Sequence, residues 1–177
     1  MKNKTSLTKD AILKDPYNYT LKEMKDCLGE EMATDFFESL YKNKPKIQNQ
    51  TVKIKEVFNG KDTLKYAFEL SDGYCIETVC IKRKTGITVC VSTMVGCPVG
   101  CIFCASGKNG FIRNLSSSEI VQQIVLLKEK VNRIVFMGMG EPLLNYGEVI
   151  KAIHILRDRD GLNFPTDGIT ISTDGPI

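Results

Sequence analysis

The sequence predicts an α/β protein, because the spacing of its apolar residues changes character twice along the chain. Residues 1–46 show helical spacing, residues 47–86 alternate with a period of two, and strand-like and helix-like runs alternate over residues 87–177. These patterns predict an N-terminal helical segment, an antiparallel β-hairpin segment, and a core with the order β-α-β-α-β. That order is typical of parallel strands joined by crossover helices.

Two short helices are expected in the N-terminal segment. Thr20 and Glu23 form a capping box before a helix over 21–28, and Gly29 is a natural stop. The second helix has one apolar face, made of Met32, Phe36, Phe37 and Leu40. The run Lys42–Lys46, which contains a proline, predicts a linker.

Three strands are expected in the hairpin segment, at Thr51–Phe58, Thr63–Leu70 and Tyr74–Lys82. The pairs Asn59-Gly60 and Asp72-Gly73 separate them, and such pairs are typical of tight hairpin turns. A small antiparallel sheet is therefore predicted.

The core begins after Gly86, and its expected strands are Ile87–Ser92, Arg133–Met137 and Gly168–Thr173. Ser116 with Glu119 predicts the start of the first helix, and Asn145 with Glu148 predicts the start of the second, which runs to about Asp158. The expected apolar face of the first helix is Ile120, Ile124, Leu127 and Val131. Each strand then leads through a helix to the next, as in a parallel sheet.

Composition favours a globular protein, with 42% hydrophobic and 25% charged residues. The net charge of +3 is compatible with an RNA partner but does not argue for one. No apolar run reaches membrane-spanning length, and charged residues interrupt the N-terminal stretch, so we expect a cytoplasmic protein without a membrane association. Seven cysteines in such a chain are expected to be reduced thiols.

Three of these cysteines, Cys97, Cys101 and Cys104, follow the first core strand with the spacing Cys-x3-Cys-x2-Cys. Three thiolates on a four-iron cluster leave one iron without a protein ligand, and this iron could chelate a methionine-derived cofactor. A zinc site is the alternative, with Cys90 or His154 as the fourth ligand. Zinc sites usually pair their ligands as two close couples, and no second couple follows here.

Residues 95–104 (VGCPVGCIFC) and residues 136–145 (FMGMGEPLLN) together carry a family resemblance. The first run resembles the cluster loop of radical S-adenosylmethionine (SAM) enzymes. With the second run, the chain is similar to the adenine-C2 methyltransferases of 23S ribosomal RNA, some of which also modify transfer RNA. The resemblance implies the first half of a radical SAM partial barrel, a 4Fe-4S cluster, SAM, an RNA partner, and an electron donor such as flavodoxin or ferredoxin.

The resemblance also implies roles for individual residues. Cys97, Cys101 and Cys104 become the cluster ligands, and the cofactor-binding residues become Gly140, Glu141 and Ser172. Glu77 matches a proton acceptor, and Cys90 matches the thiol that resolves a protein–RNA crosslink. Considered alone, Glu141 and Ser172 are compatible with ordinary strand-end turns, whereas Glu77 would be a solvated carboxylate and Cys90 a buried small side chain. Asp174 departs from the small or apolar residue that the family pattern leads us to expect after Ser172.

Two further expectations concern the RNA and the reaction. Lys82, Arg83, Lys84 and Arg113 are candidates for RNA phosphate contacts, or are simply solvated. Enzymes of this family continue past the third core strand and carry a late cysteine that is itself methylated. None of the seven cysteines matches it, so we expect no 2-methyladenine from the 177-residue chain alone. The alternatives are a catalytically inactive radical SAM fragment and a zinc-binding RNA-interaction module.

Overall fold

A six-stranded sheet organises the computed structural model, which describes residues 7–42, 50–108 and 110–175. The strand order is β1-β2-β3-β4-β7-β8. These strands span Val52–Asn59, Thr63–Leu70, Cys75–Arg83, Gly86–Cys90, Val131–Phe136 and Ile169–Ile171. A separate pair is formed by β5 (Met94–Gly96) and β6 (Phe111–Asn114).

The sheet is antiparallel in its first part and parallel in its second. β1, β2, β3 and β4 pair antiparallel in chain order, and then β4 pairs with β7 and β7 with β8 in parallel. Both kinds of pairing were expected. The hairpin segment and the core nevertheless share one continuous sheet, because β3 and β4 pair from Val79–Cys90 to Arg83–Gly86.

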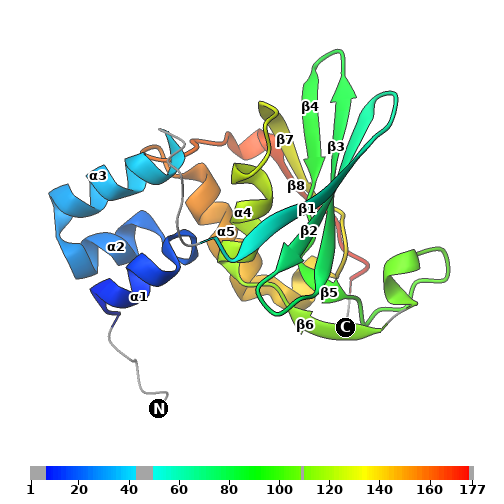
Figure 1. The fold of residues 1–177 in the computed structure, drawn as a ribbon, viewed down its shortest axis with the longest axis horizontal. Coiled ribbons are helices and arrows are strands. Elements are labelled where there is room, and N and C mark those ends of the chain that lie inside the picture. The colour runs from blue at the N-terminus through cyan, green and yellow to red at the C-terminus, as the bar shows by residue number, and fades with distance from the viewer. Residues whose placement is uncertain (1–6, 43–49, 109, 176–177) are drawn as a thin grey trace.

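The described helices lie on one side of the sheet (Figure 1). They are α1 (Lys9–Lys14), α2 (Leu21–Leu28), α3 (Glu30–Tyr41), α4 (Ser117–Val125) and α5 (Tyr146–Arg157). Short 3₁₀ turns in the described ranges are η1 (Pro16–Asn18), η2 (Ala105–Gly107), η3 (Pro142–Asn145) and η4 (Thr166–Gly168). None of the helices in the part that the structure describes is long and apolar enough to cross a membrane.

The predicted N-terminal helices are confirmed as α2 and α3. The Thr20 hydroxyl accepts from the Glu23 N–H at 3.2 Å, and the Glu23 carboxylate accepts from the Thr20 N–H at 2.8 Å. The helix α1, capped by Thr8, was not predicted because a six-residue helix leaves little periodic pattern. Except for Lys42, the predicted linker over 42–46 lies outside the described residues.

The core helices differ from expectation in one respect each. α4 ends at Val125, so Val131 opens β7 instead of extending the helical face. Asn145 is the N-cap residue of α5, as predicted, but its side chain makes no capping bond, because its N–H groups donate to Thr93 O at 2.9 Å and Leu115 O at 2.8 Å. In both places a buried tertiary partner outweighs the local signal.

Two adjacent buried glutamines join α4 to the sheet. Gln122 Oε1 accepts from Val52 N at 3.3 Å on β1. Gln123 Oε1 accepts from the Thr78 hydroxyl at 2.7 Å and from Ser92 N at 2.8 Å, while its Nε2 donates to Ser92 O at 2.9 Å. These bonds fix the helix against β1, β3 and the end of β4, where the site begins.

Candidate cofactor site

The β5–β6 pair forms the stem of the cysteine loop. β5 ends at Gly96, directly before Cys97, whose N–H donates to Gly110 O at 3.1 Å. Gly96 has a φ of +75°, and a Cβ built there would lie 1.9 Å from Gly110 O. Only glycine fits this closure without a shift of the backbone. The sequence did not predict the stem, because strands of three and four residues carry little alternation.

The three cysteines of the loop are each partly buried. Cys104 N donates to Cys101 O at 3.0 Å, and the Cys101 thiol donates to Asp174 Oδ2 at 3.4 Å in the loop after β8. Hydrogen bonds from Ser106 lower the pKa of the Cys104 thiol, whereas desolvation and Asp174 raise the pKa of Cys101. The side chains between them, Ile102 and Phe103, are 100% and 92% exposed.

The donor set of this loop fits a four-iron cluster that is held by three thiolates. Within the described ranges, no three side chains of His, Cys, Asp or Glu stand close enough together to hold a metal ion. The structure therefore shows the thiols on one loop but not gathered around a common point. His154 is exposed on α5 and Cys90 is on β4, and neither joins the loop cysteines in a ligand group there.

Glu141 is buried in the loop after β7 and connects this loop with the one after β8. Its Oε1 accepts from Leu143 N at 2.9 Å and from the Thr173 hydroxyl at 2.7 Å, and its Oε2 accepts from Asp174 N at 2.9 Å. Burial opposes ionisation, but these hydrogen bonds outweigh it and lower the pKa of Glu141. The carboxylate is therefore charged at neutral pH and retains acceptor capacity for a cationic ligand.

The Gly138–Pro142 loop is also bonded to the segment that leads into the cysteine loop. Met139 O accepts from Thr93 N at 2.8 Å, and Met139 N donates to the Ser92 hydroxyl at 3.0 Å. A Cβ at Gly140 would lie 2.6 Å from Met94 Cβ, so glycine permits this close approach. The two sequence motifs thus form one connected structure.

A pocket of about 280 Å³ opens where these loops meet. Its lining contains Cys101 and all three predicted cofactor residues, Gly140, Glu141 and Ser172. The other residues that line it are Phe103, Phe136, Met137, Gly138, Pro142, Thr173 and Asp174. Glu77, Cys90, Cys97 and Cys104 do not line it. The position, at the carboxyl ends of neighbouring parallel strands, is where α/β sheets commonly bind ligands.

Glu77 and Cys90 lie on the same face of the sheet, because Cys90 pairs with Val79, two residues after Glu77 on β3. Glu77 is exposed and its Oε1 lies 2.8 Å from Lys65 Nζ. Burial raises the pKa of the Cys90 thiol, and a hydrogen bond from the Met137 N–H partly offsets this rise. Since Met137 lines the pocket, Cys90 lies next to it, whereas Glu77 is farther out on the sheet.

Sequence reasoning missed several residues that shape the pocket. Ser92, Met139 and Thr173 act through hydrogen bonds between segments far apart in the chain, which no local motif reveals. The Thr93 hydroxyl is buried beside Gly140, where a Cβ would lie 2.8 Å from its oxygen, and this hydroxyl has no hydrogen-bond partner within the described residues.

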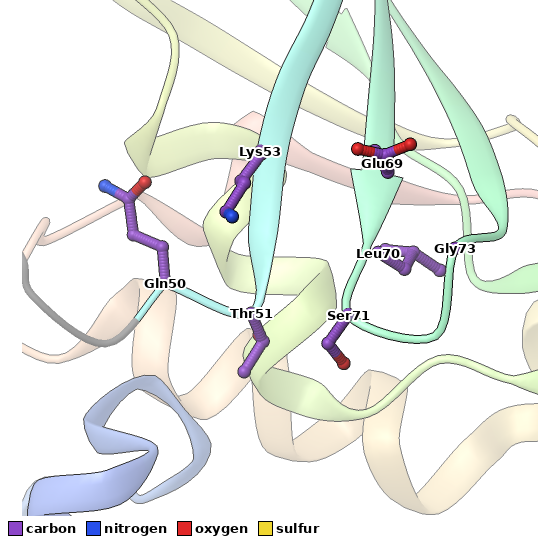
Figure 2. A pocket seen from close by; sticks show the side chains of 7 residues that line it. All are labelled: Gln50, Thr51, Lys53, Glu69, Leu70, Ser71 and Gly73. Atoms are coloured by element: carbon purple, nitrogen blue, oxygen red, sulfur yellow. The ribbon is translucent and has the colours of Figure 1, made fainter.

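Two other hollows contain none of the predicted site residues. One of about 340 Å³ lies where β1 begins and β2 ends (Figure 2). It is lined by Gln50, Thr51, Lys53, Glu69, Leu70, Ser71 and Gly73. Another, of about 430 Å³, lies between the ends of α3 and α4, with Tyr41, Leu127 and Phe164 in its lining. Neither brings together groups that match a recognisable chemistry.

Known proteins match much of this chain. Residues 91–177 match the radical SAM superfamily. A "Probable RNA methyltransferase" from Rhodopseudomonas palustris is 61% identical over 116 residues, which are 66% of this chain and 32% of that protein. A "Probable dual-specificity RNA methyltransferase RlmN" from Pseudothermotoga lettingae is 48% identical over 133 residues, covering 73% of this chain and 39% of that protein.

A solved structure agrees as well. The crystal structure of a radical SAM methyltransferase from Sphaerobacter thermophilus superimposes with a TM-score of 0.83 and 31% identity, over 90% of this chain and 57% of that one. The mixed α/β fold, the cysteine loop and the pocket beside it thus define a radical SAM protein. Within that superfamily, the chain is similar to RNA methyltransferases of the RlmN type. It spans about a third of the length of the curated relatives described above.

Proposed function

We propose that the chain binds a 4Fe-4S cluster through Cys97, Cys101 and Cys104, and SAM in the adjoining pocket. The observation that carries this proposal is the lining of one pocket by Cys101 from the cysteine loop together with Glu141 and Ser172 from the ends of two neighbouring strands. A three-thiolate cluster leaves an iron position for the cofactor, and the cofactor's ammonium group requires an ionised acceptor close by.

Glu141 would supply that acceptor, because its pKa is lowered and its Oε2 accepts a single hydrogen bond, from Asp174 N. Gly140 would let the backbone approach the cofactor, and the Ser172 hydroxyl would donate or accept a hydrogen bond in the same pocket. When bound, a reduced cluster with SAM supplies the one-electron chemistry needed to functionalise an unreactive carbon. A low-potential donor such as flavodoxin or ferredoxin would deliver the electron.

The substrate we propose is an adenine of 23S ribosomal RNA, and possible transfer RNA targets follow from the dual-specificity relatives. The reaction that we propose for the lineage of this chain is methylation at C2, in the cytoplasm. Cys90 would resolve the protein–RNA crosslink, and its hydrogen bond from Met137, which lines the pocket, supports this role. Glu77, held 2.8 Å from Lys65, would act as proton acceptor only after exchanging this partner for substrate.

Anaerobic reconstitution with iron and sulfide tests the cluster. Wild-type protein should take up about four iron atoms per chain with a Mössbauer spectrum of a 4Fe-4S cluster. Changing any of Cys97, Cys101 or Cys104 to alanine should abolish uptake, whereas Cys75→Ala and Cys80→Ala should not. Equal loss from both groups would contradict the ligand assignment. Tight zinc binding without iron–sulfide uptake would instead favour the zinc alternative.

Calorimetric titration with SAM tests the pocket. Glu141→Gln should weaken SAM binding about tenfold to a hundredfold, since a charge-assisted hydrogen bond contributes about 1.5–3 kcal/mol. The matched control is Thr173→Val, which removes one hydrogen bond to Glu141 and leaves its charge. Equal SAM affinity of wild type and Glu141→Gln would eliminate the proposed role.

The methylation step is tested by mass spectrometry of digested RNA. The family reaction uses a methyl-carrying cysteine that matches none of the seven cysteines here. We therefore expect SAM binding and slow SAM cleavage, but no 2-methyladenine, from the 177-residue chain with ribosomal RNA, SAM and reductant. A full-length relative serves as the positive control. A clear 2-methyladenine signal from this chain would show that Cys90 or another of its thiols can carry the methyl group.

A further inference from the structure

Arg113 lies outside the pocket, yet its guanidinium joins three parts of the molecule. Its Nε donates to Asp72 Oδ2 at 2.6 Å, in the turn between β2 and β3. Its Nη1 and Nη2 donate to the two carboxylate oxygens of Glu119 at 2.9 and 2.8 Å, in the first turn of α4. Nη1 also donates to Asn114 O at 3.0 Å. The sequence left open a role in RNA contact, but this guanidinium is already engaged.

The position of Arg113 connects these contacts to the cysteine loop. It lies on β6 and pairs with Val95 on β5, two residues before Cys97. The pair β5–β6 stands apart from the six-stranded sheet, so its placement depends on contacts other than ladder hydrogen bonds to that sheet. Arg113 provides such contacts on two sides, one toward the sheet turn and one toward α4.

Both partners are themselves held in place. The side chain of Glu119 is 7% exposed, and it also accepts from Ser116 N at 2.9 Å to complete the cap of α4. Asp72 accepts from Tyr74 N at 3.3 Å within its turn. A planar guanidinium fork matches the carboxylate of Glu119 with two parallel bonds, which the single ammonium of lysine does not reproduce.

We propose that Arg113 is a positioning residue, which fixes the stem of the cysteine loop against the sheet and α4 and thereby sets where the cluster lies relative to Glu141 and Ser172. The effect on the cluster position rests on the proposed cofactor function, whereas the fixing of the stem by Arg113 does not. Without the fork, the stem would pivot about β5, and Cys101 would lose its fixed place beside Asp174. The cysteines would remain on the chain as ligands.

The first experiment uses metal-free protein and does not depend on a cluster. Thiol-labelling rates of Cys97, Cys101 and Cys104 are measured by mass spectrometry in wild type, Arg113→Lys and Arg113→Ala, well below the unfolding temperature. We expect labelling at least fivefold faster in both variants, with the exposed Cys75 unchanged as internal standard. The control variant is Lys42→Ala, which removes a surface ion pair at the end of α3, away from the cysteines. Rates within twofold of wild type in Arg113→Lys would overturn the proposal.

The second experiment uses reconstituted protein. We expect Arg113→Lys to bind iron as wild type does, but to show at least a tenfold higher Kd for SAM and a smaller SAM-induced change in the electron paramagnetic resonance spectrum. A merely structural role would lower Tm and leave the Kd and the spectrum unchanged, which would also overturn the proposal. If wild type takes up no cluster, the proposed function fails, and the labelling rates still decide the role of Arg113.

Discussion

Replacing Gly96 by alanine tests how the cysteine loop is closed. The new Cβ would lie 1.9 Å from Gly110 O, where ordinary contact begins at 3.4 Å. The φ of +75° adds a left-handed penalty of about 1–2 kcal/mol, and relieving the overlap adds about 1–3 kcal/mol, as overpacking does. We expect a loss of about 2–5 kcal/mol, limited by the free energy of opening the β5–β6 pair locally.

The matched control lies in the same loop. Gly100 has a φ of +69°, but a Cβ there would meet nothing within 4 Å, so Gly100→Ala carries only the backbone penalty. Thermal unfolding gives the stability difference, and iron per chain after reconstitution reports the geometry of the loop. We expect Gly96→Ala to unfold at lower temperature and to bind less iron than Gly100→Ala. Variants that agree within about 0.5 kcal/mol and bind equal iron would refute the steric reasoning.

Three further outcomes follow from the structure. Burial raises the pKa of Cys80 from 9.0 to about 12, so the contribution of this thiol to stability is full below pH 9 and is lost as pH rises toward 12. Alkylation at pH 8 should modify the exposed Cys75 and leave Cys80 intact until the protein unfolds. Modification of Cys80 before unfolding would contradict this. Gln123→Leu should cost about 2–4 kcal/mol in urea unfolding, because it leaves buried partners without hydrogen bonds, and a loss below about 1 kcal/mol would show that water replaces the amide. Alanine at all of residues 82–84, where β3 ends and the turn to β4 begins, should weaken RNA binding and reduce the slope of its salt dependence by the equivalent of about two phosphate contacts, whereas Lys22→Ala should change neither.

The elements that sequence predicts well are those with local signals. The capping box of α2 and the strict alternation of β2 gave their bounds as the structure has them, Leu21–Leu28 and Thr63–Leu70. The end of α4 was misplaced, because the spacing of Val131 fits the helical face. In the structure Val131 opens β7 and pairs with Ile87 of β4. An apolar residue at the boundary of two elements fits both the helical and the strand spacing. Pairing in the sheet determines which element it joins.

The site divides in the same way. The spacing of the cysteines and the glycines around Glu141 are readable motifs, and the pocket brings Cys101, Gly140, Glu141 and Ser172 together. What sequence could not predict is the set of bonds that fixes them, such as Thr173 to Glu141 and Ser92 to Met139. These bonds join positions tens of residues apart, so they follow from the fold and not from spacing.

The paired glutamines of α4 restrict how this chain can be recombined with its relatives. Apolar contacts tolerate exchanges of similar volume, because dispersion has little directionality. A buried side-chain amide whose oxygen accepts and whose nitrogen donates hydrogen bonds is not replaced by a carboxylate or by a hydrocarbon side chain without loss of stability. Because Gln123 bonds to the Thr78 hydroxyl and to the backbone of Ser92, the residue at position 123 of α4 must match the residue at position 78 of β3. A chimera that takes this helix from one parent and β3 from another should be less stable where the parent of β3 lacks a hydroxyl at position 78.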